Sequence, residues 1–162
     1  MSRYQTRYGL YRPEKPRFTI KSCFKDIKEL DNVPFDVQMG YQTYTENYDG
    51  LLYRDVMLFS EDGRFCAIPM IDEAKSELLY VDRNPWLIAD QVGFYILLND
   101  TLKVEYFTNF QGGQYHSFTG VIDESGTLRI YEYYQGLGRH KVEINKPHRS
   151  KLSRVKKVVV SY

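Results

Sequence analysis

The sequence has few of the residues and none of the spacings that mark metal, catalytic and membrane proteins. Its 162 residues include two cysteines and three histidines, and none of them falls in a C-x-x-C, H-E-x-x-H or other zinc spacing. A G-x-S-x-G elbow, a phosphate loop and a dinucleotide fingerprint are also missing. No run of 18 apolar residues occurs, which excludes a membrane-spanning helix. We therefore expect a non-catalytic protein without a cofactor or a metal centre.

The two cysteines and the first residues bear on the compartment. Cys23 and Cys66 are too few for a disulfide framework and are predicted to be free, buried thiols. Residues 1–16 hold no apolar run of seven, so they do not resemble the hydrophobic part of a secretory signal. With Met1 as the natural start, the sequence predicts a cytoplasmic protein; if a leader peptide has been lost, export is expected instead.

Aromatic residues are abundant where these signals are missing. The chain has 15 Tyr, 9 Phe and 1 Trp, and aromatic side chains favour pleated sheets over helices. Its length corresponds to one domain. Residues 1–16 are predicted to be an extended arm rich in basic and aromatic residues. Residues 17–162 are predicted to be a single β-barrel domain with a basic C-terminal segment.

Alternating apolar residues and turn signals predict the elements of this domain. A short strand is expected at 17–21, and residues 52–60 and 64–71 are expected to form a hairpin around Glu61-Asp62-Gly63. Further strands are expected from 92–98 onward, and short helices at 22–30 and 72–79. Turns too short for parallel crossovers indicate antiparallel pairing. The predicted fold is mainly β: a single antiparallel up-and-down barrel of eight or nine strands with one or two short helices.

Four later strands, 102–110, 114–122, 128–134 and 140–144, can be aligned by parity. A slip of one residue moves every side chain to the opposite face, so only some loop lengths keep the apolar residues together. Three-residue loops with glycine satisfy this condition at all three connections. The resulting inner face has four rows: Leu102, Ile122 and Leu128; Val104, Gly120, Ile130 and Ile144; Tyr106, Phe118, Glu132 and Val142; Thr108, His116, Tyr134 and His140.

One end of this predicted face is aliphatic and the other is polar and aromatic. A buried Glu132 needs a hydrogen-bonding partner, because an unpaired buried carboxylate loses several kcal/mol of hydration. The mouth of a barrel is a common place for a ligand pocket. The sequence leaves two interpretations open, a solvated rim without function or a site for a small, partly apolar ligand. The predicted ligand-binding residues are Tyr106, Thr108, His116, Phe118, Glu132, Tyr134 and His140.

Two other kinds of partner are compatible with the sequence. Residues 1–21 carry a net charge of +5 and residues 139–157 a net charge of +7, so the remaining residues 22–138 carry −11. Tyrosines between the N-terminal arginines could stack on bases while cations hold phosphates. The alternative nucleic-acid site comprises Arg3, Arg7, Arg12, Lys151 and Arg154. The acidic middle and outward tyrosines at 115, 131 and 133 would instead suit a protein partner or self-association.

A family resemblance supports the barrel prediction. The stretches LFSEDGRFCAI, GFYILLNDTLKVEYF, GGQYHSFTGVID and GTLRIYEYY resemble the strands of small bacterial lipocalin-like, or calycin-type, proteins. The resemblance implies an up-and-down antiparallel barrel with a hydrophobic interior for a small ligand. Lipocalins carry Gly-x-Trp near the first strand, whereas here Trp86, the single tryptophan, follows Asn84-Pro85. No family site residue is transferred to this chain.

Overall fold

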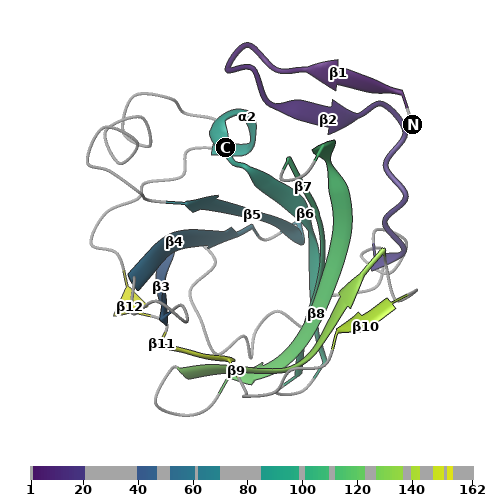
Figure 1. Ribbon diagram of the computed structural model, residues 1–162. Helices are drawn as coiled ribbons and strands as arrows, with labels where there is room; N and C mark the ends of the chain where they lie inside the picture. The colour runs from purple at the N-terminus through teal and green to yellow at the C-terminus, as the bar shows by residue number, and fades with distance from the viewer. Residues whose placement is uncertain are drawn as a thin grey trace.

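The computed structural model describes residues 2–20, 40–46, 52–60, 62–69, 85–98, 101–109, 112–122, 127–136, 140–142, 148–151 and 153–154. Within these residues the protein is mainly β, as predicted, with one short helix (Figure 1). The elements are β1 (Arg3–Gln5), β2 (Tyr11–Pro13), β3 (Gly40–Glu46), β4 (Leu52–Phe59), β5 (Arg64–Pro69), α2 (Pro85–Ile88), β6 (Gln91–Leu98), β7 (Thr101–Thr108), β8 (Gln114–Ile122), β9 (Thr127–Gln135), β10 (His140–Val142), β11 (His148–Lys151) and β12 (Ser153–Arg154).

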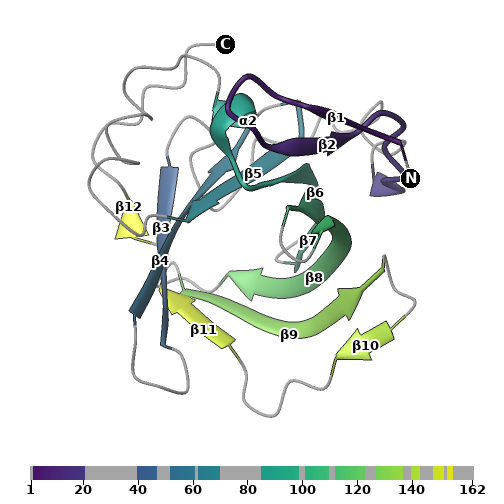
Figure 2. The ribbon, with the colours of Figure 1, turned by 45° about the horizontal axis from the view of Figure 1, so that its top comes forward.

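Ten of the strands form one antiparallel sheet. From β3 to β10 the neighbours follow the order of the chain, which is the up-and-down connection expected from short turns. The sheet curls strongly (Figures 1 and 2), and its last strands lie near its first ones. Strand β11 pairs with β9 and lies beside β3, while β12 pairs with β3. Strands β11 and β12 therefore contact the curled sheet near both of its ends.

The predicted hairpin at 52–60 and 64–71 is confirmed as β4 and β5. Phe59 pairs with Phe65 across the hairpin, and the amide of Ser60 donates to the carbonyl of Arg64 over 2.9 Å. The Arg64 guanidinium also donates to the Asp62 carboxylate over 2.6 Å. These hydrogen bonds stabilise the turn at the position that the sequence predicts.

The earlier part of the chain departs from the predictions. Residues 17–20 are not in a strand, because the amides of Thr19 and Ile20 donate to the Glu105 carboxylate instead of to a neighbouring strand. Helix α2 was not predicted, although Pro85 suits the first position of a helix. The helices predicted at 22–30 and 72–79 lie outside the described residues.

The inner face of the curled sheet holds the main core. Its members come from β4 to β9, and they include the apolar residues that the parity argument placed together on β7, β8 and β9. Val104 and Ile130 lie in this one cluster, as the parity argument requires, while Ile144 lies outside the described residues. The cluster comprises Met57, Phe59, Phe65, Ala67, Tyr95, Leu102, Val104, Tyr106, Phe118, Ile122 and Leu128, with Leu97, Ile130 and Tyr133 packed against it.

The side chains of β7 and β8 lie on the predicted faces of the sheet, but the pairing of the two strands is shifted by two residues from the predicted register. Val104 pairs with Phe118 and Tyr106 with His116, where the prediction paired Tyr106 with Phe118. The connection is longer than three residues because β7 ends at Thr108. Asn109 leaves the ladder, and its amide and side chain both bond to the carbonyl of Asp90. A shift of two residues leaves the same side chains on the inner face.

Strand β9 contains a bulge that changes its face. Gly120 pairs with Ile130 as predicted, but Thr119 pairs with Glu132, so Tyr131 is an extra residue. The backbones approach closely here, since a Cβ on Gly120 would lie 2.8 Å from the carbonyl oxygen of Arg129. Beyond the bulge, Tyr133 faces the core. The prediction that Glu132 and Tyr134 share the inner face with Phe118 is therefore wrong.

The predicted pairing of β9 with β10 is also wrong by one residue, and this error cancels the one that the bulge in β9 caused. The amide of Gly136 donates to the carbonyl of Tyr115 over 2.7 Å, and β9 extends to Gln135, so four residues separate β9 from β10 along the chain. His140 pairs with Gln135 and Val142 with Tyr133, whereas Tyr134 and Glu132 were the predicted partners. Because Gln135 also pairs with His116, His116 and His140 still occupy one cross-strand row.

A second apolar cluster covers the outer face of β4 and β5. Helix α2 packs on it with Trp86, and the cluster comprises Val56, Leu58, Cys66, Ile68, Ile88 and Ala89, with Trp86 and Val92 packed against it. The N-terminal residues do not form one continuous extended arm. They fold into the hairpin β1–β2 beside α2 (Figure 1). Arg12 of β2 is buried and donates to the carbonyls of Trp86 and Ala89, near the end of α2.

Candidate functional site

Three polar side chains meet at one end of the inner face. The hydroxyl of Tyr133 lies 3.2 Å from the hydroxyl of Tyr106 and 2.5 Å from Nδ1 of His116. The Tyr106 and His116 rings are stacked, with centroids 5.5 Å apart and an interplanar angle of 16°. Strands β7, β8 and β9 contribute one residue each. We call Tyr106, His116 and Tyr133 the tyrosine–histidine cluster.

Burial sets the charge of the tyrosine–histidine cluster. Desolvation lowers the pKa of His116 below its ordinary value of 6.5, so the imidazole is neutral at pH 7. Desolvation also raises the pKa of Tyr133 above 10, against the opposing effect of its hydrogen bond with Tyr106. The Tyr133 hydroxyl therefore keeps its proton, and the bonded pair of Tyr133 and His116 is uncharged at neutral pH.

A neutral cluster can carry its protons in two arrangements. If Tyr133 donates to Nδ1 of His116, then Nε2 carries the imidazole proton and is a donor. If Nδ1 donates to Tyr133, then Nε2 is an acceptor. Within the described residues, the His116 side chain makes one hydrogen bond, at Nδ1 with Tyr133. Nε2 is thus the atom of the cluster at which a further polar group can bind, as a donor or as an acceptor.

Two other predicted site residues lie beside the cluster. Phe118 is 4% exposed, and its ring is T-shaped to that of Tyr106 at a centroid distance of 6.3 Å. Thr108 follows two residues after Tyr106 on the same face of β7 and is also buried. The structure therefore brings together Tyr106, Thr108, His116 and Phe118. His140 shares the cross-strand row of His116 through Gln135.

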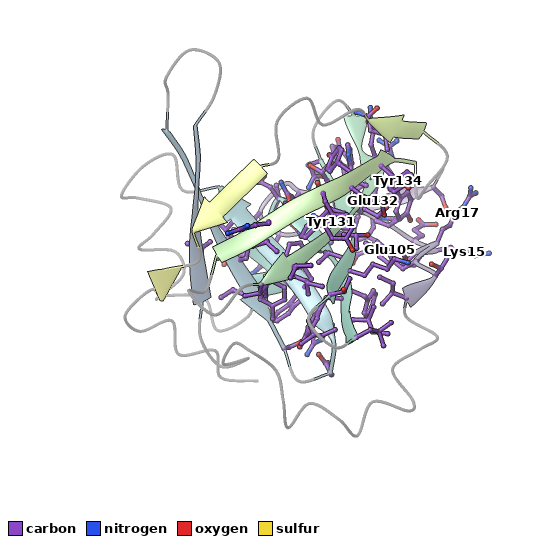
Figure 3. The ribbon with its side chains drawn as sticks, turned by 90° about the horizontal axis from the view of Figure 1, so that it is seen from below. Lys15, Arg17, Glu105, Tyr131, Glu132 and Tyr134 are labelled. Carbon is purple, nitrogen blue, oxygen red and sulfur yellow. The ribbon has the colours of Figure 1, made fainter. Side chains whose placement is uncertain are left out.

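Glu132 and Tyr134 lie on the outer face. They pair with Thr119 and Ser117, which alternate with the inward-facing Phe118. The hydroxyl of Tyr134 donates to Oε1 of Glu132 over 3.4 Å, and Figure 3 shows both residues on the side of the molecule where Lys15 and Arg17 lie. His116 and Glu132 therefore cannot contribute to one metal site, a combination that the predicted register would have allowed.

The sequence argument missed Tyr133. In the run Tyr131-Glu132-Tyr133-Tyr134 the odd-numbered and the even-numbered positions both contain tyrosine. The pattern of aromatic residues therefore does not show where the extra residue of the bulge falls. Gly120 is the signal that could have located it, because a glycine within a strand often marks a bulge or a close approach of two backbones.

The five residues of the alternative nucleic-acid site do not form one surface. Arg3 and Arg7 are exposed on the N-terminal hairpin, and the Arg7 guanidinium lies 5.0 Å from the centroid of the Tyr8 ring. Arg12 is 5% exposed and directed to backbone carbonyls, so it is not accessible to phosphates. Lys151 and Arg154 belong to β11 and β12, far from that hairpin in both views (Figures 1 and 2).

The three tyrosines predicted to face outward differ in exposure. Tyr131 is 49% exposed on the outer face. Tyr115 is also on the outer face but is buried, because Phe18 packs against it. Tyr133 faces inward. An interface made of all three tyrosines is therefore excluded.

Comparison with known proteins adds no assignment. No family model, no curated protein and no solved structure matches the chain. Within the described ranges, no helix is long and apolar enough to cross a membrane.

Proposed function

We propose that the protein binds a small, uncharged and partly apolar molecule at the polar end of the inner face. The tyrosine–histidine cluster is the observation that carries this proposal. Three hydrogen-bonding side chains at the end of an otherwise apolar core are the arrangement typical of ligand sites, in which apolar walls give affinity and a few polar groups fix orientation. The protein would act as a binding protein and not as a catalyst.

The proposal includes closure of the sheet into a barrel. Pairing of β11 with β9 and of β12 with β3 supports closure, because the same short stretch of chain contacts both ends of the sheet. In a barrel of this size the inner face has no free edge and its two ends become the points of access to the interior. The lipocalin-like resemblance of the strands agrees with this architecture and contributes no site residue.

The chemistry of the cluster defines the class of ligand. A neutral imidazole bonded to the hydroxyl of Tyr133 offers no charge to an anion or a cation. Nε2 of His116 would bind a carbonyl or a hydroxyl of the ligand. Phe118 and Tyr106 would contact an apolar or aromatic part of the same molecule, since their rings belong to the inner core. A planar molecule with one hydroxyl or carbonyl satisfies these conditions.

Binding of 2-naphthol, an uncharged aromatic alcohol, tests the proposal. The full chain is titrated with the probe and binding is followed by calorimetry and by probe fluorescence. We expect His116→Phe to weaken binding about tenfold, because one hydrogen bond contributes roughly 1–1.5 kcal/mol. Glu132→Gln is the matched control, since it alters a polar side chain of β9 on the outer face, and it should leave the affinity unchanged.

Three results would overturn the proposal. These are no binding of 2-naphthol to the wild-type chain, equal affinities of the wild type and His116→Phe, or a larger loss in Glu132→Gln than in His116→Phe. Thermal unfolding of each variant, measured without the probe, separates a loss of binding from a loss of folded protein.

A further inference from the structure

A short piece of the chain is bound on the outer face of β6, β7 and β8. Residues 17–20 lie across this face without joining the sheet. They contact Glu105 of β7, Phe94 of β6 and Tyr115 of β8, residues that are more than 70 positions away in the sequence. We call Phe94, Glu105 and Tyr115 the outer docking site.

Glu105 is the polar centre of the outer docking site. Its side chain is 9% exposed although it is on the outer face. The carboxylate accepts hydrogen bonds from the amide of Thr19 at 2.6 Å, from the amide of Ile20 at 3.1 Å and from the hydroxyl of Thr19. Bonds to a charged acceptor are among the stronger ones in proteins. The buried carboxylate is thus satisfied by two consecutive amides of the bound segment.

Aromatic contacts complete the docking. The Phe18 ring is T-shaped to both Phe94 and Tyr115, with centroid distances of 5.3 Å in each case. The amide of Arg17 donates to the hydroxyl of Tyr115 over 3.2 Å. Side chain and backbone of the segment are both recognised, which makes the outer docking site selective for an aromatic residue followed by threonine.

The N-terminal segment (residues 2–20) is a separate unit attached at discrete points. Its strands β1 and β2 form their own two-stranded sheet and pair with no strand of the large sheet. Its charged side chains are five basic and one acidic, whereas residues 22–138 carry a net charge of −11. Nineteen residues, 21–39, connect it to β3. A chain of that length spans up to about 60 Å when extended, enough to reach another molecule.

We propose that the outer docking site also accepts the N-terminal segment of a second copy of this chain, so that two copies exchange these segments. The exchanged form makes the same contacts as the single chain and needs no new interface. Within one chain, the connection gives the segment an effective concentration on the order of millimolar. Exchange in the wild type is therefore expected only in concentrated protein.

Two variants that complement each other provide the test. Thr19→Pro removes the amide hydrogen and the hydroxyl that Glu105 accepts, so this chain holds its own residues 17–20 weakly and keeps an intact Glu105. Glu105→Lys abolishes the acceptor, so this chain also holds its residues 17–20 weakly but keeps an intact Thr19. Both chains lose the internal bonds between Glu105 and Thr19, while the bonds of Arg12 to the carbonyls near α2 remain in both. We expect each variant alone to be a monomer and their mixture to contain a heterodimer at a concentration at least tenfold below that at which the wild type dimerises.

Native mass spectrometry and sedimentation velocity measure the species, and a chain carrying both substitutions is the control. Mixed with Thr19→Pro, the double variant should form no dimer, because neither chain then has an intact segment. The proposal is overturned if the complementary mixture remains monomeric at every concentration tested, or if the control mixture dimerises equally. If circular dichroism shows Glu105→Lys to be unfolded, Glu105→Leu, which has no charge and no hydrogen-bond acceptor in its side chain, replaces it with the same expected outcomes.

Discussion

Tyr133 and His116 are joined by a hydrogen bond of 2.5 Å between the tyrosine hydroxyl and Nδ1 of the imidazole. The same hydroxyl lies 3.2 Å from that of Tyr106, so one side chain of β9 links β8 and β7 across the inner face. The bulge in β9 makes this contact, because without the extra residue Glu132 would occupy the inner position.

Removal of this hydroxyl should destabilise the protein without changing its fold. Tyr133→Phe keeps the ring that packs on the core and leaves Nδ1 of His116 and the Tyr106 hydroxyl without their shared partner. A buried polar group that loses its hydrogen bond costs about 1–3 kcal/mol. We expect the free energy of unfolding, measured by urea denaturation, to fall by that amount.

Tyr131→Phe is the matched control for this variant. Tyr131 precedes Tyr133 by two residues, is 49% exposed and belongs to the outer face. Its substitution should change the free energy of unfolding by less than about 0.5 kcal/mol. Equal effects of the two substitutions would show that Tyr133 has no special partner on the inner face.

The sequence was sufficient to predict strands β4 to β10 and most of the inner face. Alternation of apolar and polar residues is strong on β7 and β8, and any shift by an even number of residues preserves it. The two-residue shift between these strands therefore left Tyr106, His116 and Phe118 on the predicted face. Burial decides which face of the sheet each side chain occupies. The length of a connection depends instead on local contacts, such as that of Asn109 with Asp90.

The alternation of side chains could not locate the bulge, and the sequence showed no sign of the N-terminal contacts. From Tyr131 to Tyr134 the odd-numbered and the even-numbered positions both contain tyrosine, so the extra residue leaves no trace in β9, and the only signal is Gly120 on the neighbouring strand. The contact of Glu105 with Thr19 joins residues 86 positions apart, and a carboxylate on an outer face gives no sign of being buried. Both features depend on which segments meet in three dimensions.

Acidification should weaken the fold through His116. Burial holds the pKa of this group below 6.5 in the folded protein, so the unfolded chain binds the proton more tightly. Stability contributed by the neutral imidazole is complete above pH 6.5 and is lost as the pH falls from there toward the lower folded pKa. One proton limits the slope to about 1.4 kcal/mol per pH unit.

His116→Asn removes this contribution. Urea denaturation between about pH 7.5 and about pH 5 should give a smaller dependence of stability on pH in the variant than in the wild type, because other titrating groups contribute equally to both. Parallel curves for the two proteins would mean that His116 titrates alike in the folded and unfolded states, contrary to its burial.

The thiol of Cys66 should be unreactive in the folded protein. The side chain is fully buried in the outer cluster beside α2, and burial raises the pKa of this thiol. Because the thiolate is the reactive form, a Cys23→Ser chain should react with Ellman's reagent only after denaturant unfolds it. Rapid labelling of the native protein would contradict the packing of α2 over β5.

Gly93 is a position at which any side chain would clash with the backbone of the neighbouring strand. Gly93 of β6 pairs with Tyr106 of β7, and a Cβ at this position would lie 1.9 Å from the carbonyl oxygen of Glu105 and 2.6 Å from Cα of Tyr106. These are backbone atoms, so the clash can be relieved only by separating the two strands. Gly93→Ala should therefore lower the free energy of unfolding by roughly 3 kcal/mol or more.

Gly112→Ala separates this steric effect from the general cost of replacing a glycine. Gly112 has a φ of +80°, and a Cβ added to it would meet no atom within 4 Å, so alanine there meets only backbone strain of about 1–2 kcal/mol. Urea denaturation should rank Gly93→Ala well below Gly112→Ala in stability. The reverse order would mean that the backbones of β6 and β7 do not approach each other closely beside Tyr106.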